Sequence, residues 1–121
     1  MTDLVACLTS MQGKSAWNHV KNLASAEGYW DKVILITDDE QKADFEIATP
    51  KYIVLIDFSQ PIEDVVRDLS GELRKLVTSY EIALNFVSGN GKEHMALISA
   101  IMKLGIGFRL MARTREGISE I

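Results

Sequence analysis

Short apolar runs alternate with amphipathic stretches along most of this chain, and that alternation constrains the fold more than any other feature. The runs are continuously apolar rather than alternating with polar residues, as in strands that are buried on both faces of a sheet. We expect strands at Leu4–Thr9, Val33–Thr37, Tyr52–Asp57, Ile82–Val87 and Phe108–Ala112. Strands of this kind are typical of a parallel sheet that helices cover on both faces.

Three stretches between the apolar runs have apolar residues at the helical period, with charged residues on the other side. In chain order they are Ser15–Glu27, Ile62–Leu76 and Glu93–Leu104. Pro61 fits the first turn of the second helix, where its missing N–H costs nothing. Gly28 and Gly105 suit the C-terminal ends of the first and third helices. The acidic segment Asp38–Pro50 is compatible with a short helix or with a loop that contains one helical turn.

This order of elements predicts an α/β, Rossmann-like three-layer domain with a mainly parallel sheet of five or six strands. Right-handed crossovers restrict the possible strand orders to a few, among which we expect 3-2-1-4-5. The 121 residues contain no linker-like stretch, internal repeat or low-complexity tract. We therefore expect one domain over residues 1–121.

Charge and cysteine content exclude several classes of protein. The formal net charge of -4 argues against a binder of duplex DNA, which usually has a basic excess. The single cysteine, Cys7, has no second cysteine for an internal disulfide and lies in an apolar run. No apolar run approaches the ~20 residues that span a bilayer, and the N-terminus lacks the pattern of a signal peptide. We expect a cytoplasmic protein that contacts neither duplex DNA nor a membrane.

Two strand-to-helix loops form the most plausible binding site. In an open parallel sheet, ligands bind beyond the carboxyl ends of the strands where the strand order reverses. In the expected order the loop Ser10–Ser15 follows the first strand and lies beside the loop Ser88–Lys92 after the fourth. Backbone N–H groups and a lysine at helix N-termini suit a phosphate or polyphosphate ester. The predicted ligand-binding residues are Ser10, Met11, Gln12, Gly13, Lys14, Thr37, Ser88, Gly89, Asn90, Gly91, Lys92 and His94.

Several better-known site types do not match these loops. A phosphate-binding P-loop requires a glycine where Phe86 stands and a hydroxyl residue where Glu93 stands. The dinucleotide fingerprint fails because the glycines follow the fourth strand and its last position is His94. His19, His94 and Cys7 show no metal-ligand spacing, and no serine follows a nucleophile-elbow pattern. We therefore expect neither a metal nor a cofactor.

The stretch Ala83–Leu97 resembles the signature of CARF domains, the CRISPR-associated Rossmann-like sensors. In that family an apolar strand is followed by Asn, then by Ser/Thr-Gly-Gly-Thr-Lys and a helix with Met and small residues. Trp30–Thr37 and Tyr52–Val66 are similar to the second strand and to a following strand and helix of the same family. Asn90 stands for the second glycine and Gly91 for the threonine, whereas Lys92 is retained.

The resemblance implies a homodimeric sensor domain of a CRISPR-type defence system that binds a cyclic oligoadenylate across its two-fold axis. Because most members carry an effector domain, it also implies a possible effector protein as partner. One alternative is a metal-independent ring nuclease, in which Lys92 stabilises the developing charge and Ser10 or Ser88 orients the nucleophile. A second alternative, from Asn90 and Gly91, is a degenerate dimerisation or interaction domain without a ligand. A general mononucleotide binder is a further alternative.

Overall fold

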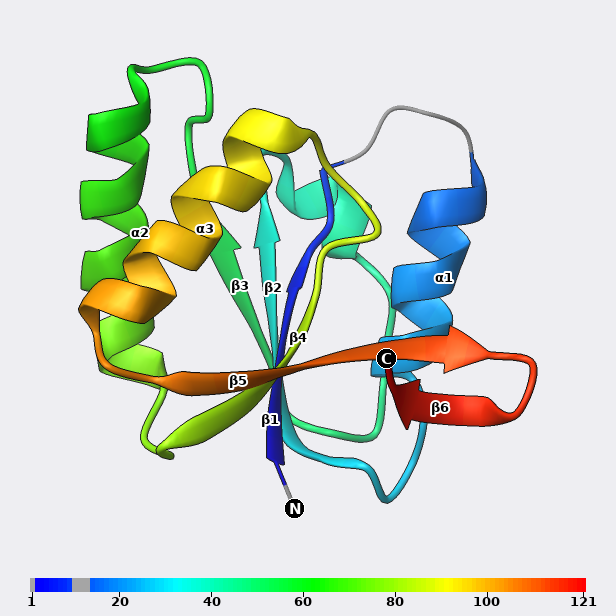
Figure 1. Ribbon diagram of the computed structural model, residues 1–121. Helices are drawn as coiled ribbons and strands as arrows, with labels where there is room; N and C mark the ends of the chain where they lie inside the picture. The colour runs from blue at the N-terminus through cyan, green and yellow to red at the C-terminus, as the bar shows by residue number, and fades with distance from the viewer. Residues whose placement is uncertain (1, 10–13) are drawn as a thin grey trace.

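A computed structural model describes residues 2–9 and 14–121 of the chain and has a Rossmann-like α/β fold (Figure 1). Its elements are β1 (Thr2–Cys7), α1 (Lys14–Ala24), β2 (Trp30–Thr37), the 3₁₀ helix η1 (Glu40–Ala43), β3 (Lys51–Leu55), α2 (Ile62–Leu76), β4 (Glu81–Asn85), α3 (Gly91–Lys103), β5 (Gly107–Thr114) and β6 (Gly117–Glu120). The sheet has six strands in the order β3-β2-β1-β4-β5-β6. This confirms the predicted order and adds β6, which pairs antiparallel with β5 at one edge.

Helices cover both faces of the sheet, as the continuous apolar runs predict. Side chains of β1 alternate between the two faces, and all of those in the two cores are fully buried. Val5 and Cys7 pack in the core beneath α2 and α3. Leu4 and Ala6 pack in the second core, against α1 and the segment that contains η1. Figure 1 shows α1 on one side of the sheet and α2 and α3 on the other.

The expectation that Tyr52–Asp57 is a strand buried on both faces is wrong. The strand β3 is an edge strand that pairs with β2. Tyr52, Ile53 and Leu55 are 43%, 40% and 58% exposed, respectively. An apolar run of β-branched residues has the same sequence pattern in a central strand and in an edge strand. Whether a second strand pairs with it depends on the topology of the whole sheet, which the segment itself does not show.

Helix ends differ from the predicted ones by a few residues. The helix α1 ends at Ala24, earlier than the expected Glu27. Pro61 precedes α2 as its N-cap rather than lying in its first turn. Within Asp38–Pro50, the possibility of a loop that contains one helical turn is confirmed, because η1 is a single 3₁₀ turn.

Gly105 ends α3 as expected. Its φ of 70° lies in the left-handed region. Its N–H donates to the Met102 carbonyl at 3.1 Å, and the Ile106 N–H donates to the Ile101 carbonyl at 3.3 Å. These two bonds form a Schellman motif, a C-terminal cap made from backbone groups alone.

Candidate functional site

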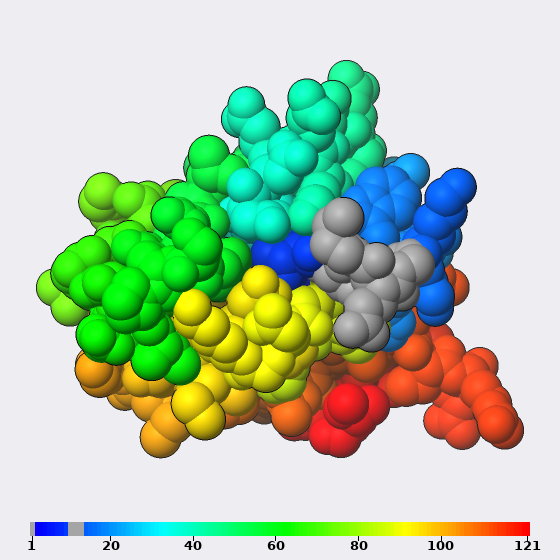
Figure 2. All heavy atoms as spheres, turned by 90° about the horizontal axis from the view of Figure 1, so that it is seen from above, coloured from blue at the N-terminus to red at the C-terminus, as the bar shows by residue number. Residues whose placement is uncertain are grey.

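The candidate site lies at the carboxyl edge of β1 and β4, which pair in parallel. From β1 the chain passes to β2 on one side, and from β4 it passes to β5 on the other, so the strand order reverses between them. Seen from above, the end of β1 lies between the start of α3, in yellow, and the segment after β2, in cyan (Figure 2). The predicted contacts Ser10, Met11, Gln12 and Gly13 lie outside the described residues.

Thr9, just beyond β1, ties the start of the first loop to the second loop. Its backbone N–H donates to Ser88 Oγ at 3.0 Å, and its hydroxyl donates to Glu93 Oε1 at 2.5 Å. Thr9 and Glu93 are almost fully buried, and Ser88 is completely buried. The predicted adjacency of the two loops is thus realised where they begin. The Ser88 hydroxyl is occupied by a contact within the protein.

Asn90 is the N-cap of α3 and forms a capping box with Glu93. Asn90 Oδ1 accepts from the Glu93 N–H, and the Asn90 N–H donates to Glu93 Oε1, both at 3.0 Å. Asn is among the strongest N-cap residues, since its side chain satisfies an otherwise unpaired amide of the first turn. The position that departs from the CARF pattern therefore has a local structural explanation.

Gly89 is required at its position for two independent reasons. Its φ of 107° is a conformation that side chains rarely adopt. A Cβ there would lie 2.9 Å from both Glu93 Oε1 and His94 Nε2, and 3.0 Å from Thr9 Oγ1. The situation at Gly91 is the opposite, because no atom lies within 4 Å of a Cβ built there. A side chain such as the family's threonine fits at Gly91.

Lys92 is exposed at the second position of α3. Its ammonium donates to the Gln60 carbonyl at 2.6 Å, in the loop between β3 and α2. In the same loop, hydrogen bonds from Ser59, with a smaller contribution from Lys92, hold the pKa of the exposed Asp57 carboxyl below its usual value. None of the predicted ligand-binding residues belongs to this loop, although Asp57 is expected at the edge of the site. It joins the site through contacts between residues about thirty positions apart.

His94 is half-buried and turned toward its own loop. Its Nε2 lies 2.9 Å from the Ser88 carbonyl oxygen, and a carbonyl only accepts, so this nitrogen carries a hydrogen. The ring packs on Phe86 with centroids 4.7 Å apart. His94 therefore packs against its own loop, and its Nε2 is occupied by the hydrogen bond to the Ser88 carbonyl.

Two further predicted residues, Thr37 and Lys14, differ from each other in burial. Thr37 is fully buried, and its Oγ1 lies 2.8 Å from the Leu8 carbonyl oxygen and accepts from the Asp39 N–H at 3.2 Å. It therefore joins the ends of β1 and β2. Lys14 is exposed at the first position of α1.

Lys42 of η1 is a residue of this edge that the sequence analysis missed. Its ammonium pairs with Asp38 at 2.8 Å and donates to the Thr9 carbonyl at 3.3 Å. Nothing in the sequence distinguishes this lysine from a solvated one, because the contact depends on how the acidic segment folds back over β1. Lys14, Lys42 and Lys92 thus belong to three separate elements that begin or lie at this edge of the sheet.

Ammonium groups and helix N-termini at this edge are suited to binding an anion. Burial, with a smaller contribution from Glu93, raises the pKa of the Cys7 thiol to about 12, so it stays protonated. Among the described residues, no group of three or more His, Cys, Asp or Glu side chains is arranged to hold a metal ion. Within the same residues, no helix has the length and apolar character needed to cross a membrane.

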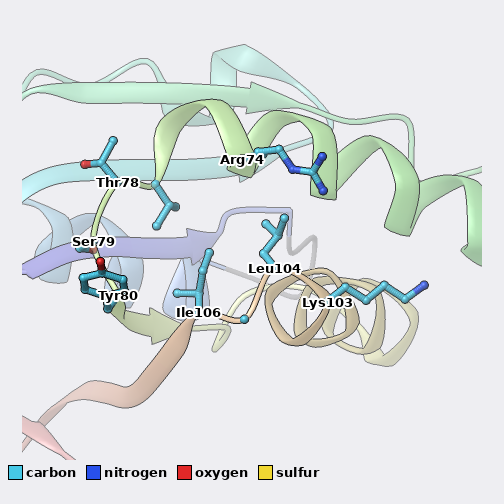
Figure 3. A pocket seen from close by; sticks show the side chains of 9 residues that line it. Arg74, Thr78, Ser79, Tyr80, Lys103, Leu104 and Ile106 are labelled. Atoms are coloured by element: carbon cyan, nitrogen blue, oxygen red, sulfur yellow. The ribbon is translucent and has the colours of Figure 1, made fainter.

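A cavity of about 430 Å³ lies at the opposite, amino edge of the sheet, between the C-terminal ends of α2 and α3. Val77, Leu104 and Ile106 line it together with the segment 78–80. The side chains of Arg74 and Lys103 extend away from Thr78, Ser79 and Tyr80 (Figure 3). Cations in the last turn of a helix balance the negative end of its dipole, so these two need no ligand to explain them.

Neither a comparison with models of known protein families nor a comparison with curated proteins finds a match to this chain.

Proposed function

We propose that this chain is a sensor domain of a CRISPR-type defence system that binds a cyclic oligoadenylate as a homodimer. The observation that carries the proposal is Lys92, an exposed cation at the second position of α3, directly after a loop whose conformation needs Gly89 and whose end is fixed by the capping box. It lies at the reversal of strand order, where Rossmann-like sheets bind nucleotides. The resemblance of Ala83–Leu97 to CARF domains supplies the class of ligand.

The physical fit is to a phosphodiester. Helix geometry leaves the N–H groups of Gly91 and Lys92 without intrahelical partners, at the positive end of the α3 dipole. A charge-assisted hydrogen bond from the ammonium would add to these groups. A ring of phosphodiesters centred on a two-fold axis would receive the same set of donors from each subunit.

Two observations favour a binding domain over the ring nuclease and over the degenerate domain without a ligand. Ser88 is fully buried and accepts a hydrogen bond from Thr9, which disfavours it as the residue that orients a nucleophile in a ring nuclease. Ring cleavage would therefore depend on Lys92 and on Ser10, which lies outside the described residues. The capping role of Asn90 and the open space at Gly91 favour binding over degeneration, because neither departure from the family pattern blocks the loop.

The test is calorimetry of the homodimer with cyclic tetra-adenylate and cyclic hexa-adenylate. We expect one ring to bind, and Lys92→Ala to weaken it by roughly tenfold or more, since a hydrogen bond to a charged group contributes about 1.5–3 kcal/mol. Lys103→Ala, at the other end of the same helix, is the matched control and should leave the affinity unchanged. A dimeric sample that binds neither ring would overturn the proposal.

The same samples distinguish binding from cleavage. Each labelled ring is incubated with the protein in the presence of a chelator, and the products are separated by chromatography. Intact ring is the expected result for a sensor. Linear fragments that disappear with Lys92→Ala would instead establish the ring-nuclease alternative.

A further inference from the structure

Asn85 connects three parts of the molecule at the base of the candidate loop. It is the last residue of β4 and is 3% exposed. Its Oδ1 accepts from the Val87 N–H at 3.1 Å, which fixes the first turn of the loop that leads to Lys92. Its Nδ2 donates to the Met111 carbonyl of β5 at 2.8 Å and lies 3.2 Å from His19 Nε2 of α1.

The chemistry of these partners determines the protonation state of His19. A backbone N–H only donates and a carbonyl only accepts, so Val87 and Met111 allow a single orientation of the Asn85 amide. That orientation points an N–H of Nδ2 at His19. His19 Nε2 must then accept, which requires a neutral ring with its proton on Nδ1.

The electrostatic surroundings of His19 also favour the neutral ring. Partial burial lowers the pKa of His19, and the positive charge of Arg113 on β5 lowers it further. The strand β4 presents the uncharged Asn85 to the ring, and β1 presents the buried apolar Ala6, the register partner of Asn85. The neighbours of His19 one turn away on α1 are uncharged, namely Ser15, Ala16, Asn22 and Leu23.

We propose that His19 is a positioning residue for the binding loop, and that its protonation releases the loop and weakens ligand binding. A protonated ring would direct an N–H at the Nδ2 of Asn85 and place a second positive charge near Arg113. To avoid two N–H groups pointing at each other, the Asn85 amide would have to break its hydrogen bonds to Val87 and Met111 or move away from α1. The effect on ligand binding rests on the proposed function, whereas the effect on the loop does not.

The first experiment follows the free protein by NMR between about pH 7.5 and about pH 5.5, the range in which histidines titrate. We expect the Nδ1–H form of His19, a midpoint below the ordinary histidine value, and amide shifts of Val87–Lys92 that follow it. His19→Gln should abolish this dependence, because its side-chain carbonyl accepts from Asn85 at every pH. His19→Phe, which cannot accept, should disturb the same amides at every pH. An Nε2–H form of His19, or loop amides that do not follow its titration, would overturn the inference.

The second experiment measures ring affinity over the same range. In the natural protein the affinity for the ring should decrease as the pH is lowered, by up to about tenfold for each pH unit below the midpoint of the His19 titration in the folded state. The reason is that one proton on His19 converts the protein to a form that binds the ring weakly. His19→Gln should bind with little change. Equal pH slopes in both proteins would overturn the inference. If neither ring binds at any pH while the loop amides still follow His19, the positioning role is supported and the proposed function fails.

A further variant keeps the proposal testable if His19→Gln does not fold. Asn85→Asp places a carboxylate opposite the ring, which stabilises the protonated form. The His19 midpoint should then move above its value in the natural protein, and the loop amides should titrate at the higher pH. A midpoint that is unchanged or lower would contradict the contact between these two side chains.

Discussion

The two ends of α3 have cations of the same kind in opposite electrostatic surroundings. Lys103 lies in the last turn, where the helix dipole favours a positive charge, and α2 ends in the same way with Arg74 and Lys75. Lys92 lies in the first turn, where the dipole opposes it. Helix electrostatics alone accounts for the cations beside the amino-edge cavity, whereas the cation at the carboxyl edge is there for another reason.

The two ends also differ in how they are capped. The C-terminal cap at Gly105 uses backbone groups alone. The N-terminal cap uses the side chains of Asn90 and Glu93, and Glu93 in turn accepts from Thr9. Substitutions at the N-terminal end therefore disturb the contact with Thr9, just beyond β1, while those at the C-terminal end act locally.

The largest effect is expected for Gly89→Ala. The left-handed backbone conformation costs an alanine about 1–2 kcal/mol, and overpacking against Glu93 and His94 adds about 1–3 kcal/mol. Gly105→Ala, which has a positive φ but open space around its Cβ position, should cost only the first of these amounts. Urea denaturation of both variants measures the difference. Equal losses would mean that the close contacts at Gly89 relax without cost.

Glu93→Ala should lower the free energy of unfolding by about 1–3 kcal/mol, because it leaves the Thr9 hydroxyl and the Asn90 N–H without their acceptor. The exposed Glu116 offers a matched control, and Glu116→Ala should change stability by less than about 0.5 kcal/mol. Thermal and urea unfolding provide the measurement. A loss at Glu93 no larger than at Glu116 would show that the capping box contributes nothing.

Lys103→Ala should destabilise the protein by about 0.3–1 kcal/mol through the loss of a favourable interaction with the helix dipole. Lys92→Ala should have a smaller effect of either sign, because relief from the unfavourable dipole offsets the lost bond to Gln60. Chemical denaturation at low ionic strength gives the clearest comparison. Should Lys92→Ala prove the more destabilising of the two, its primary role would be structural, as a bridge to the loop before α2.

Gly91→Ser is expected to have the smallest effect, a gain of a few tenths of a kcal/mol in stability. The position is helical, its surroundings are open, and replacing glycine reduces the entropy of the unfolded chain. The variant also places a hydroxyl where the CARF pattern has one, so under the proposed function calorimetry should show ring affinity equal to or above that of the natural protein. Weaker binding would show that the site uses the bare backbone of Gly91.

Much of the fold was predictable because hydrophobic periodicity reports which faces are buried. The order of the first five strands is the expected one among the few that the alternation of strands and helices and the handedness of crossovers allow. The exposure of β3 was not predictable, because an edge has no local signature. The strand β6 has the sequence Gly-Ile-Ser-Glu, too short to show a pattern of its own.

For the candidate site, topology predicted the location but not the state of each polar group. In the sequence Ser88 looks like an exposed loop residue and Thr37 like the end of a strand at the site edge, yet both are buried and hydrogen-bonded. Gln60 and Lys42 come to the site from segments distant in the chain, and spacing cannot reveal such contacts. The sequence motif therefore contains only part of the residues that shape this edge.

The hydrogen bonds of Thr9 mean that the conformation of the loop after β4 depends on a distant part of the chain. They join residues that are 79 and 84 positions apart, across the pairing of β1 with β4. A synthetic peptide covering Ala83–Leu97 would contain the whole motif but neither Thr9 nor the strand β1 that precedes it. Such a peptide would sample many loop conformations and lose the ordering entropy again on binding, whereas folding of the sheet has already restricted the loop to one conformation. The ligand recognition proposed for this edge would thus depend on the assembled sheet, and the motif alone would not transfer it.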